Sequence, residues 1–258
     1  MTKRKSIFTI MFSFVLMLCC ACIFTACGIT PNDDNNDNNN DAGEYQTDTL
    51  NSATQIKTAI GDTYYITVEV SASSSEDVDE TFTYTIVSDG TWFYGVYGNT
   101  DTVYLVERNE SNYTVYLYDE ETDSYVYADT YQDVDETEYA SYFDMGYLFA
   151  GSMFGYTSSI DYTSKQNKTF LGRAAVEYTQ TESWSIPGYG SYQYSDVVII
   201  DNATGACLKH SISGSASAGG EHASGSYAFE CKKFVVGSNT EITTTLAAQQ
   251  AKIAANQD

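Results

Sequence analysis

Apolar and polar residues alternate along most of the chain after residue 62. This is the pattern of β-strands that pack one face and expose the other. The first such run places Tyr64, Ile66 and Val68 on one face and Tyr65 and Thr67 on the other. The strands expected from runs of this kind cover residues 64–71, 80–88, 91–97, 102–108, 112–118, 124–129, 172–180, 182–186, 191–200, 206–214 and 224–236.

Turn residues separate these runs. Asp89-Gly90 is typical of a two-residue hairpin turn. Residues 187–190, Pro-Gly-Tyr-Gly, indicate a loop or bulge, and residues 201–205 indicate a turn in which Gly205 suits a positive φ. Short strands at this regular spacing predict an antiparallel meander, because parallel strands need long crossover connections.

Helical spacing occurs near both ends of this region. Leu50, Ala53, Ile56 and Ile60 recur at the period of an amphipathic helix, and Gly61 follows where a C-terminal cap belongs. We expect this short helix to lay one apolar stripe on the sheet. The Ala-, Gln- and Thr-rich residues 241–256 predict a weak C-terminal helix or a frayed tail.

A third helical pattern interrupts the meander at residues 138–155. Asp135 and Glu138 are placed like an N-cap and its N3 partner. Glycines within the stretch each weaken a helix by ~1 kcal/mol and can divide it in two. We interpret it as a core-facing helix, with a mobile lid over an apolar cavity as the alternative. Its candidate cavity-lining residues are Tyr139, Tyr142, Phe143, Tyr147, Met153 and Phe154.

The first 26 residues have the pattern of a secretory signal peptide. Residues 3–5 are basic, residues 6–26 carry no charge, and Ala26 is the small residue expected before a cleavage site. Residues 24–27, Phe-Thr-Ala-Cys, resemble the lipobox of bacterial lipoproteins. An uncleaved anchor helix is the alternative, since about 20 apolar residues can span a bilayer.

The lipobox resemblance implies a lipid anchor at Cys27. In that family the cysteine thiol carries a diacylglycerol and the chain is cut just before it. Two acyl chains, palmitate for example, hold a protein stably on a membrane, whereas one chain does so only marginally. The resemblance therefore implies an extracytoplasmic protein anchored to the bacterial cell envelope.

Residues 27–47 are expected to form a disordered tether. Residues 31–43 are rich in Asn and Asp and have no apolar periodicity. A calcium loop is the alternative, but the window that begins at Asp37 has Ala42 where the loop pattern needs Gly. The predicted organisation is thus a signal peptide (1–26), a tether (27–47), a β domain (48–240) and a C-terminal helix or tail (241–258).

The charge balance excludes some classes of partner. The chain has 12 Lys and Arg against 35 Asp and Glu, a net charge of −23. Three of the basic residues and none of the acidic ones lie in residues 1–26, so the remainder carries −26. Such a charge argues against nucleic-acid binding and against electrostatic attachment to anionic membranes. With 23 Tyr and 12 Phe the chain has ample material for a core, and we expect a monomer.

Only two cysteines follow Cys27, at positions 207 and 231. Their midpoint is Gly219, so a hairpin centred there would set them directly opposite each other. Such a pair can oxidise outside the cytoplasm, provided that the cross-strand geometry permits the bond. Cys207 and Cys231 are therefore disulfide candidates, with two buried free thiols as the alternative.

No pattern of catalysis or metal binding is evident. His210 and His222 lie on opposite arms of the same predicted hairpin, but two His without a Cys-x-x-Cys give no zinc pattern. The sequence has no G-x-S-x-G, phosphate-binding loop or G-x-G-x-x-G. We therefore expect no enzyme, no cofactor and no metal.

Three stretches resemble the lipoprotein carriers of the LolA, LolB and LppX group. They are residues 170–178, which match a strand entry with Gly172 and Tyr178, residues 198–209, with the Ile-Asp-x-x-Thr-Gly turn, and residues 227–234. The resemblance implies a mainly β (α+β) fold. Its form is an unclosed antiparallel β-barrel or half-barrel with a short N-terminal helix and a central helical plug. It also implies binding of acyl chains or lipoproteins, and no ligand-contact residue of that group carries over to this chain.

Two hypotheses for function remain. In the first, the domain is a lipid-anchored binding module that holds an apolar ligand, a lipid or acyl chain, between its sheet and helix 138–155. In the second, it is a cell-surface protein that contacts glycan or protein through exposed tyrosines, which offer apolar area with a hydrogen-bonding tip. Cross-strand pairing that only stabilises the sheet is the alternative role for these tyrosines. They are Tyr104, Tyr116, Tyr118, Tyr125 and Tyr127.

Overall fold

A computed structural model describes residues 45–75, 79–98, 102–134 and 159–254. The chain divides into a unit of residues Met1–Asp41 and a unit of residues Ala42–Asp258, and every described residue belongs to the second. Its elements are β1 (Gln46–Thr49), α2 (Ala53–Ile60), β2 (Thr63–Ser74), β3 (Glu80–Asp89), β4 (Trp92–Tyr97), β5 (Thr102–Asn109), β6 (Asn112–Asp119), β7 (Ser124–Tyr131), β8 (Ser159–Tyr162), β9 (Ser164–Phe170), β10 (Arg173–Ile186), β11 (Gly190–Asp201), β12 (Cys207–Ala218), β13 (Glu221–Val236) and α5 (Thr240–Ala254).

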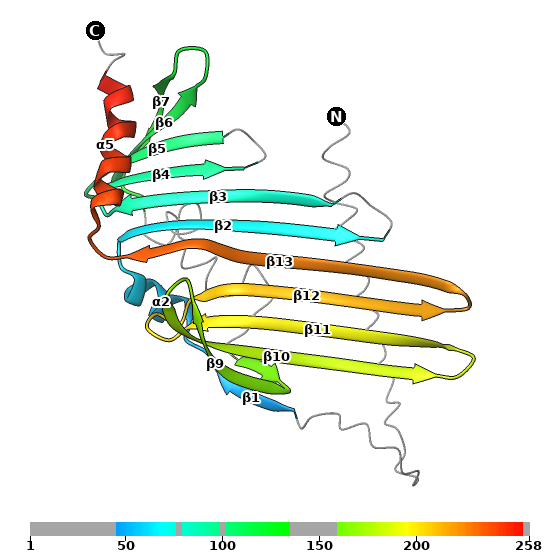
Figure 1. The fold of residues 1–258 in the computed structure, drawn as a ribbon. Coiled ribbons are helices and arrows are strands. Elements are labelled where there is room, and N and C mark those ends of the chain that lie inside the picture. The colour runs from blue at the N-terminus through cyan, green and yellow to red at the C-terminus, as the bar shows by residue number, and fades with distance from the viewer. Residues whose placement is uncertain (1–44, 76–78, 99–101, 135–158, 255–258) are drawn as a thin grey trace. The chain divides into compact units, whose positions relative to one another are not determined.

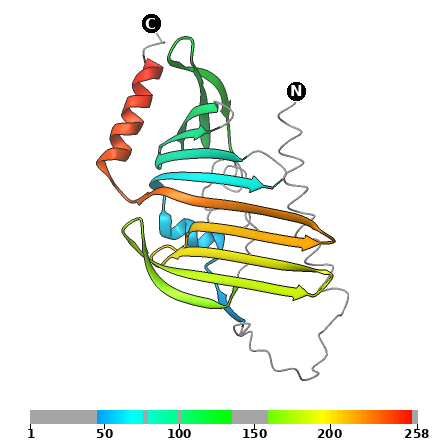
Figure 2. The ribbon, with the colours of Figure 1, turned by 45° about the vertical axis from the view of Figure 1, so that its right-hand side comes forward.

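Eleven of these strands form one open antiparallel sheet. Their order is β7-β6-β5-β4-β3-β2-β13-β12-β11-β10-β9, so β7 and β9 are its two edges (Figures 1 and 2). Each strand pairs with its neighbour in sequence, except where the last strand, β13, joins the first long strand, β2. The predicted mainly β, antiparallel and unclosed architecture is therefore confirmed. β1 and β8 form a separate two-stranded sheet.

The two faces of the large sheet are distinguished by the helix that packs on each. Residues directly opposite each other in register share a face. On the face that we name the α2 face, one continuous row across six strands holds Tyr178, Val198, His210, Phe229, Val70 and Phe82. The other face, which we name the α5 face, carries the residues between them.

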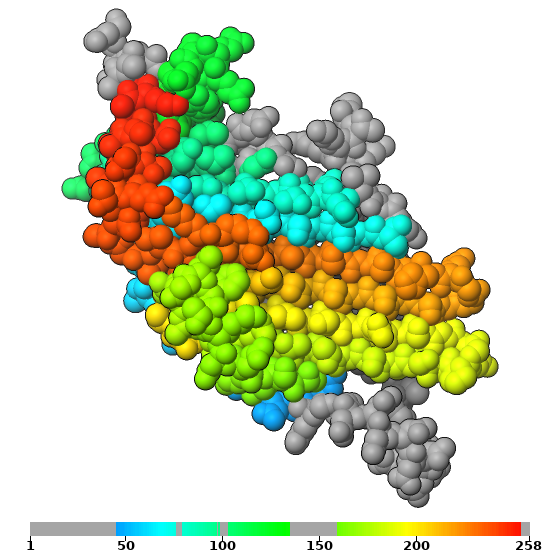
Figure 3. Space-filling model, in the orientation of Figure 1, coloured from blue at the N-terminus to red at the C-terminus, as the bar shows by residue number. Residues whose placement is uncertain are grey.

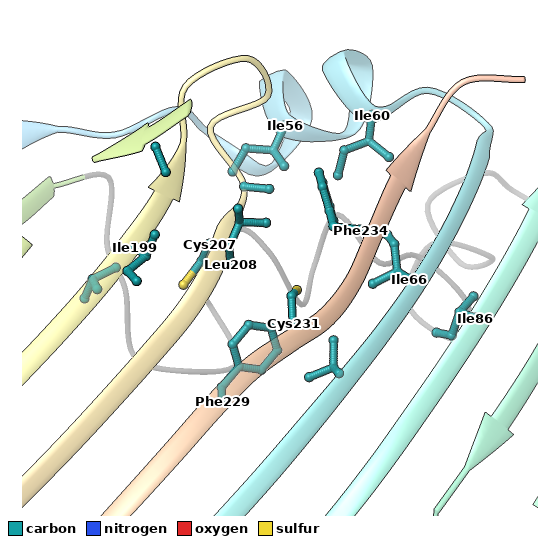
Figure 4. Packing of buried hydrophobic residues seen from close by; sticks show 14 of the residues in the cluster. Ile56, Ile60, Ile66, Ile86, Ile199, Cys207, Leu208, Phe229, Cys231 and Phe234 are labelled. Carbon is teal, nitrogen blue, oxygen red and sulfur yellow. The ribbon is translucent and has the colours of Figure 1, made fainter. Parts of the chain in front are cut away.

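Helix α2 caps one end of the α2 face. Ser52 Oγ accepts a hydrogen bond from the backbone N–H of Gln55, and Gln55 Oε1 accepts one from the backbone N–H of Ser52. This capping box satisfies two donors that the helix itself leaves unpaired, and Gly61 ends the helix with φ 70°. Ile56 and Ile60 are buried toward the strands, where Leu208, Phe234 and Ile66 meet them (Figure 4). The predicted helix and its glycine cap are confirmed.

Helix α5 packs on the opposite face, over the strands near β7. Ile242 and Leu246 are buried with Val87, and Ile253 is buried with Leu105 and Tyr125. Gln249 Oε1 accepts a 3.0 Å hydrogen bond from Tyr125 Oη. Figure 3 shows this face, with α5 across the ends of the strands and the far ends of β10–β13 free of any helix. Within the described ranges, neither helix has the length and apolarity that a membrane crossing needs.

Several short polar strands escaped sequence analysis. Gln46–Thr49 and Ser159–Tyr162 are strands β1 and β8, so regular structure begins inside the predicted tether 27–47. Ser164–Phe170, an almost entirely polar segment, is edge strand β9. The predicted strands 172–180 and 182–186 are one strand, β10, because its pairing with β11 continues unbroken to Ile186 opposite Gly190.

The cysteine prediction is wrong in its register. The hairpin pairs Ala218 with Glu221 across the two-residue turn Gly219-Gly220, so its centre lies beyond Gly219 and Cys207 is not directly opposite Cys231. Both side chains are buried thiols of the main core cluster, on adjacent strands (Figure 4). The Cys207 thiol donates to the carbonyl of Lys209 at 3.3 Å. No disulfide joins Cys207 and Cys231 in this structure.

Some predictions fall outside the described residues. They are the signal peptide, the lipidation site at Cys27, the Asn/Asp-rich segment 31–43 and the helix 138–155. The six candidate cavity-lining residues of that helix therefore stay predictions.

Candidate functional site

The ends of β10–β13 that lie away from helix α2 are joined by the turns at 187–189 and 219–220. At these ends, the two faces of the sheet carry side chains of different chemistry. On the α5 face, hydroxyl side chains oppose each other from strand to strand, as in Ser191 with Ser217 at 2.8 Å and Ser226 with Ser73 of the adjoining β2 at 2.7 Å. On the α2 face the same strands carry aromatic, aliphatic and small side chains. Across the strands its positions are Trp184, Tyr192, Ala216 and Ala223 in one row and Ile212 with Tyr227 in another. Apolar surface is thus collected on one face only.

Three aromatic rings form a stack on this part of the α2 face. Trp184 lies opposite Tyr192 in register, with ring centroids 6.1 Å apart and planes at 24°. Tyr192 in turn stacks on Tyr194, at 6.4 Å and 8°. Trp184 is 48 % exposed, while both tyrosines are half-buried. Offset stacking holds such rings in a fixed orientation, so the structure offers a preformed aromatic surface.

A buried polar group lies beside the stack. His210 is 2 % exposed, its Nε2 lies 3.0 Å from Asp196 Oδ1, and the Tyr227 ring meets it edge-on at 6.3 Å. Tyr194 Oη donates to Asp196 Oδ2 at 3.2 Å. Asp196 therefore lies between the aromatic stack on β11 and His210 on β12.

The tyrosine hydroxyls of this face stay protonated. Burial raises the pKa of Tyr194, and the neighbouring Asp196 carboxylate raises it further. Burial also raises the pKa of Tyr227, and the nearby ionisable groups of Tyr84 and Cys207 raise it further by charge repulsion. The pKa of Tyr192 is raised by burial and then by the Glu182 carboxylate. Each phenol is hence a neutral hydrogen-bond donor over the physiological range.

One buried ion pair holds the β10–β11 end of the core. Asp201 is 1 % exposed and accepts from Arg173 Nε at 2.7 Å and from Arg173 Nη2 at 2.9 Å. Its Oδ2 also accepts from the backbone N–H of Thr204 at 2.9 Å and from Thr204 Oγ1 at 2.7 Å. Gly205 ends this turn at φ 74°, as the sequence predicted. The ion pair joins the first two stretches that carried the family resemblance.

The two histidines are not brought together. His210 pairs with Phe229 and His222 with Ser217, which places them on opposite faces of the hairpin. Among the residues that the structure describes, no three His, Cys, Asp or Glu side chains form a group that could hold a metal ion.

The prediction that five tyrosines form an exposed surface is wrong for two of them. Tyr104 and Tyr125 are buried, at 7 % and 2 % exposure, and Tyr104 lies on the α2 face, whereas the other four lie on the α5 face. Across the strands, Tyr118 meets Tyr125 at 5.4 Å with planes tilted by 58°, and Tyr116 meets Tyr127 edge-on at 6.5 Å. These four tyrosines do pair across the strands, and a contact of Tyr116, Tyr118 and Tyr127 with glycan or protein stays a prediction.

Sequence reasoning missed the aromatic stack, although a signal for it exists. In β10, Trp184 and Ile186 alternate with Ser183 and Ser185, and in β11 the aromatic residues also fall at every second position. This alternation shows that one face is apolar. The stacking depends on the register between the strands, which the alternation alone does not provide.

Comparison with known proteins gives distant structural likenesses. No protein-family profile matches the chain, and neither does any curated protein sequence. Among solved structures, LprF from Mycobacterium bovis aligns with a TM-score of 0.32 and 12 % identity, over 74 % of this chain and 97 % of that one. A DUF1329 family protein from Desulfovibrio piger aligns with 0.27 and 10 %, over 77 % and 96 %. LolA superfamily protein NE2245 from Nitrosomonas europaea aligns with 0.26 and 8 %, over 74 % and 96 %. Likenesses at these TM-scores assign neither a ligand nor an activity.

Proposed function

We propose that this protein is a lipid-anchored, extracytoplasmic lipoprotein whose sheet domain binds an apolar ligand, a lipid or acyl chain, without catalysing a reaction. The observation that carries the proposal is the difference between the two faces of β10–β13. An aromatic and aliphatic surface with half-buried and exposed rings lies on the α2 face, while the α5 face of the same strands is lined by hydroxyl groups. Apolar surface of this kind is stabilised when it is removed from water.

Exchange of the stacked rings tests the ligand-binding part of the proposal. A variant with Trp184→Ser and Tyr192→Ser loses two apolar rings from the α2 face. We expect its affinity for the neutral probe N-phenyl-1-naphthylamine to fall about tenfold or more, because each ring contributes about 1 kcal/mol or more of apolar contact. The measurement is a fluorescence titration, with native mass spectrometry of the purified protein to detect a lipid that accompanies it.

The matched control changes the intervening residues of the same strands. Ser183→Ala and Gln193→Ser alter the α5 face at neighbouring positions, which are exposed and opposite each other in register. We expect this control to bind the probe as the parent does. Two outcomes would rule out the α2 face as a lipid-binding surface. One is an equal loss of probe affinity in the test variant and in the control. The other is that the parent protein neither binds the probe nor carries a co-purified lipid.

Removal of the Cys27 thiol tests the membrane anchor. With a Cys27→Ala change we expect metabolic labelling by a clickable fatty acid to disappear and the protein to leave the membrane fraction. Each buried CH₂ of an acyl chain contributes about 0.8 kcal/mol to membrane binding, and the variant would lose both chains. Lipidation at Cys27 would be contradicted if the parent protein took up no label and the Cys27→Ala variant remained in the membrane fraction.

A further inference from the structure

The charges around the aromatic stack indicate which ligand it prefers. Glu182 lies directly opposite Tyr194 in register, and Asp196 occupies the next α2-face position of β11. We define the acid–aromatic patch as Glu182, Trp184, Tyr192, Tyr194 and Asp196. Its carboxylates act on the rings, since the Glu182 charge contributes to the raised pKa of Tyr192 and the Asp196 charge to that of Tyr194.

The lysines of β12 and β13 are all on the other face. Lys209 and Lys232 pair with Glu230 at 2.8 Å, and Lys232 also pairs with Glu69 at 3.0 Å, all on the α5 face. Lys233 binds Glu241 and lies over the ring of Tyr65, also on the α5 face.

On the α2 face, Lys165 of β9 lies over the Tyr178 ring and pairs with Asp48, and Arg173 of β10 lies over the Phe234 ring and pairs with Asp201. In the described strands, the α2-face positions from Gln180 to Ile186, and those opposite them on β11, β12 and β13, include no Lys or Arg.

From this asymmetry we propose that the acid–aromatic patch binds the positively charged head of an amphiphile, such as an alkylammonium, while the tail lies on the neighbouring apolar residues of the α2 face. A cation is attracted to the faces of Trp and Tyr rings and to carboxylates, and both meet in this patch. An anionic head, such as a fatty-acid carboxylate, is repelled by Glu182 and Asp196. The proposal rests on the proposed function, because it specifies the head group of the apolar ligand.

The tail has a defined surface beside the patch. Ile212 and Tyr227 are half-buried, opposite each other in register, and in the same cross-strand row as Asp196. Next to this row, Gly214 and Gly225 form a cross-strand pair without side chains. A tail can therefore lie close to the sheet there, between the aromatic stack and Tyr227.

Three ligands with the same twelve-carbon chain test the proposal. They are dodecyltrimethylammonium, the uncharged tri(ethylene glycol) dodecyl ether and dodecanoate at pH 7.4, all below their micelle concentrations and titrated against the full chain. We expect the cation to bind about tenfold more tightly than the uncharged ligand, and dodecanoate most weakly. A Glu182→Gln, Asp196→Asn variant should reduce the preference for the cation about fivefold without changing the affinity for the uncharged ligand.

Two further variants separate local recognition from the overall negative charge. Trp184→Leu keeps apolar area but removes the ring, so it should weaken binding of the cation more than binding of the uncharged ligand. Glu120→Gln, in the exposed turn between β6 and β7, removes one remote charge and should leave the order of affinities as it is. Each variant is first checked by circular dichroism for its parent fold.

The outcomes are distinguishable. If none of the three ligands binds, the proposed function fails, and this inference with it. If all three bind equally, the apolar surface is real and the preference for a cationic head is refuted. If the cation is preferred but the preference survives in the Glu182/Asp196 and Trp184 variants, the overall charge of the protein accounts for it and the patch does not.

Discussion

Replacement of Asp201 by Asn is expected to destabilise the domain by about 3 kcal/mol. Removing one partner of a buried ion pair leaves an uncompensated charge and typically costs 3–5 kcal/mol. We expect the lower end of that range, because the side chain of Arg173 is 24 % exposed whereas that of Asp201 is 1 % exposed. The free energy of unfolding, measured by urea denaturation, checks this value.

The control for this prediction is a more exposed ion pair. Glu230 binds Lys209 and Lys232, but its side chain is 28 % exposed. Glu230→Gln should therefore cost less than about 1 kcal/mol, as solvent-exposed pairs do. Equal effects of the two substitutions would contradict the special role of the Arg173–Asp201 pair.

The same ion pair predicts a dependence of stability on pH. Burial alone would raise the pKa of Asp201, but hydrogen bonds from Arg173 and Thr204 outweigh it, and the pKa is lowered. The folded protein thus binds this proton less readily than the unfolded chain, whose Asp titrates near a pKa of about 3.9. The stabilisation is present above that pH and disappears as the pH falls through the folded pKa. The Asp201→Asn variant should therefore lose less stability than the parent below about pH 4. Part of the acid-induced loss should remain in the variant, because the pKa values of Glu177 and Glu230 are also lowered.

The turn of this ion pair could be predicted from sequence, but its partner could not. Residues 201–205 carry local turn chemistry, so the turn and the positive φ of Gly205 were predictable. Arg173 lies 28 residues earlier and reaches Asp201 because β10 and β11 pair in a register that sets Ala175 opposite Asp201. Long hairpins fix such registers through turn geometry and packing over many residues, which a single sequence does not display.

Edge elements escaped prediction for a related reason. β1 and β9 have few apolar residues, so no alternation marks them as strands. They are strands because a neighbour offers a complementary row of backbone donors and acceptors, as Thr47 opposite Asp161 shows. Lys165 and Lys168 of β9 form ion pairs with Asp48 and Glu177, and charged side chains of this kind protect a sheet edge from further pairing.

For the candidate site too, the local sequence pattern predicts one part, and the other part depends on the register between strands. Alternation in β10 and β11 assigns Trp184, Tyr192 and Tyr194 to one side of their strands, and this much the sequence contains. The stack arises only when Trp184 faces Tyr192 across the hairpin. The cysteine prediction shows how sensitive such reasoning is, because a hairpin centre displaced by half a residue was enough to misplace Cys207 relative to Cys231.

Replacement of Gly95 by Ala is expected to destabilise the domain by about 2–3 kcal/mol, although Ala is by itself the better strand residue. Gly95 lies directly opposite Tyr104 on the α2 face, and a Cβ at Gly95 would lie 2.6 Å from Cζ of the Tyr104 ring. The ring cannot simply move aside, because it is 7 % exposed and stacked on Phe93 at 5.8 Å. Overpacking of this kind costs about 1–3 kcal/mol, and an unfolding curve of the Gly95→Ala variant gives the value.

A second substitution identifies the cause of that loss. Tyr104→Leu removes the ring that the new methyl group would meet, so in the Tyr104→Leu background Gly95→Ala should be nearly neutral or slightly stabilising. The double-mutant cycle then gives a coupling energy of about 2 kcal/mol between the two positions. Independent, additive effects would mean that Gly95 is required for its backbone conformation and not for the close approach of the Tyr104 ring. Because Gly95 and Tyr104 occupy the row that continues to Leu117 and Val126, the same cycle reports how tightly the β3–β7 half of the α2 face is packed.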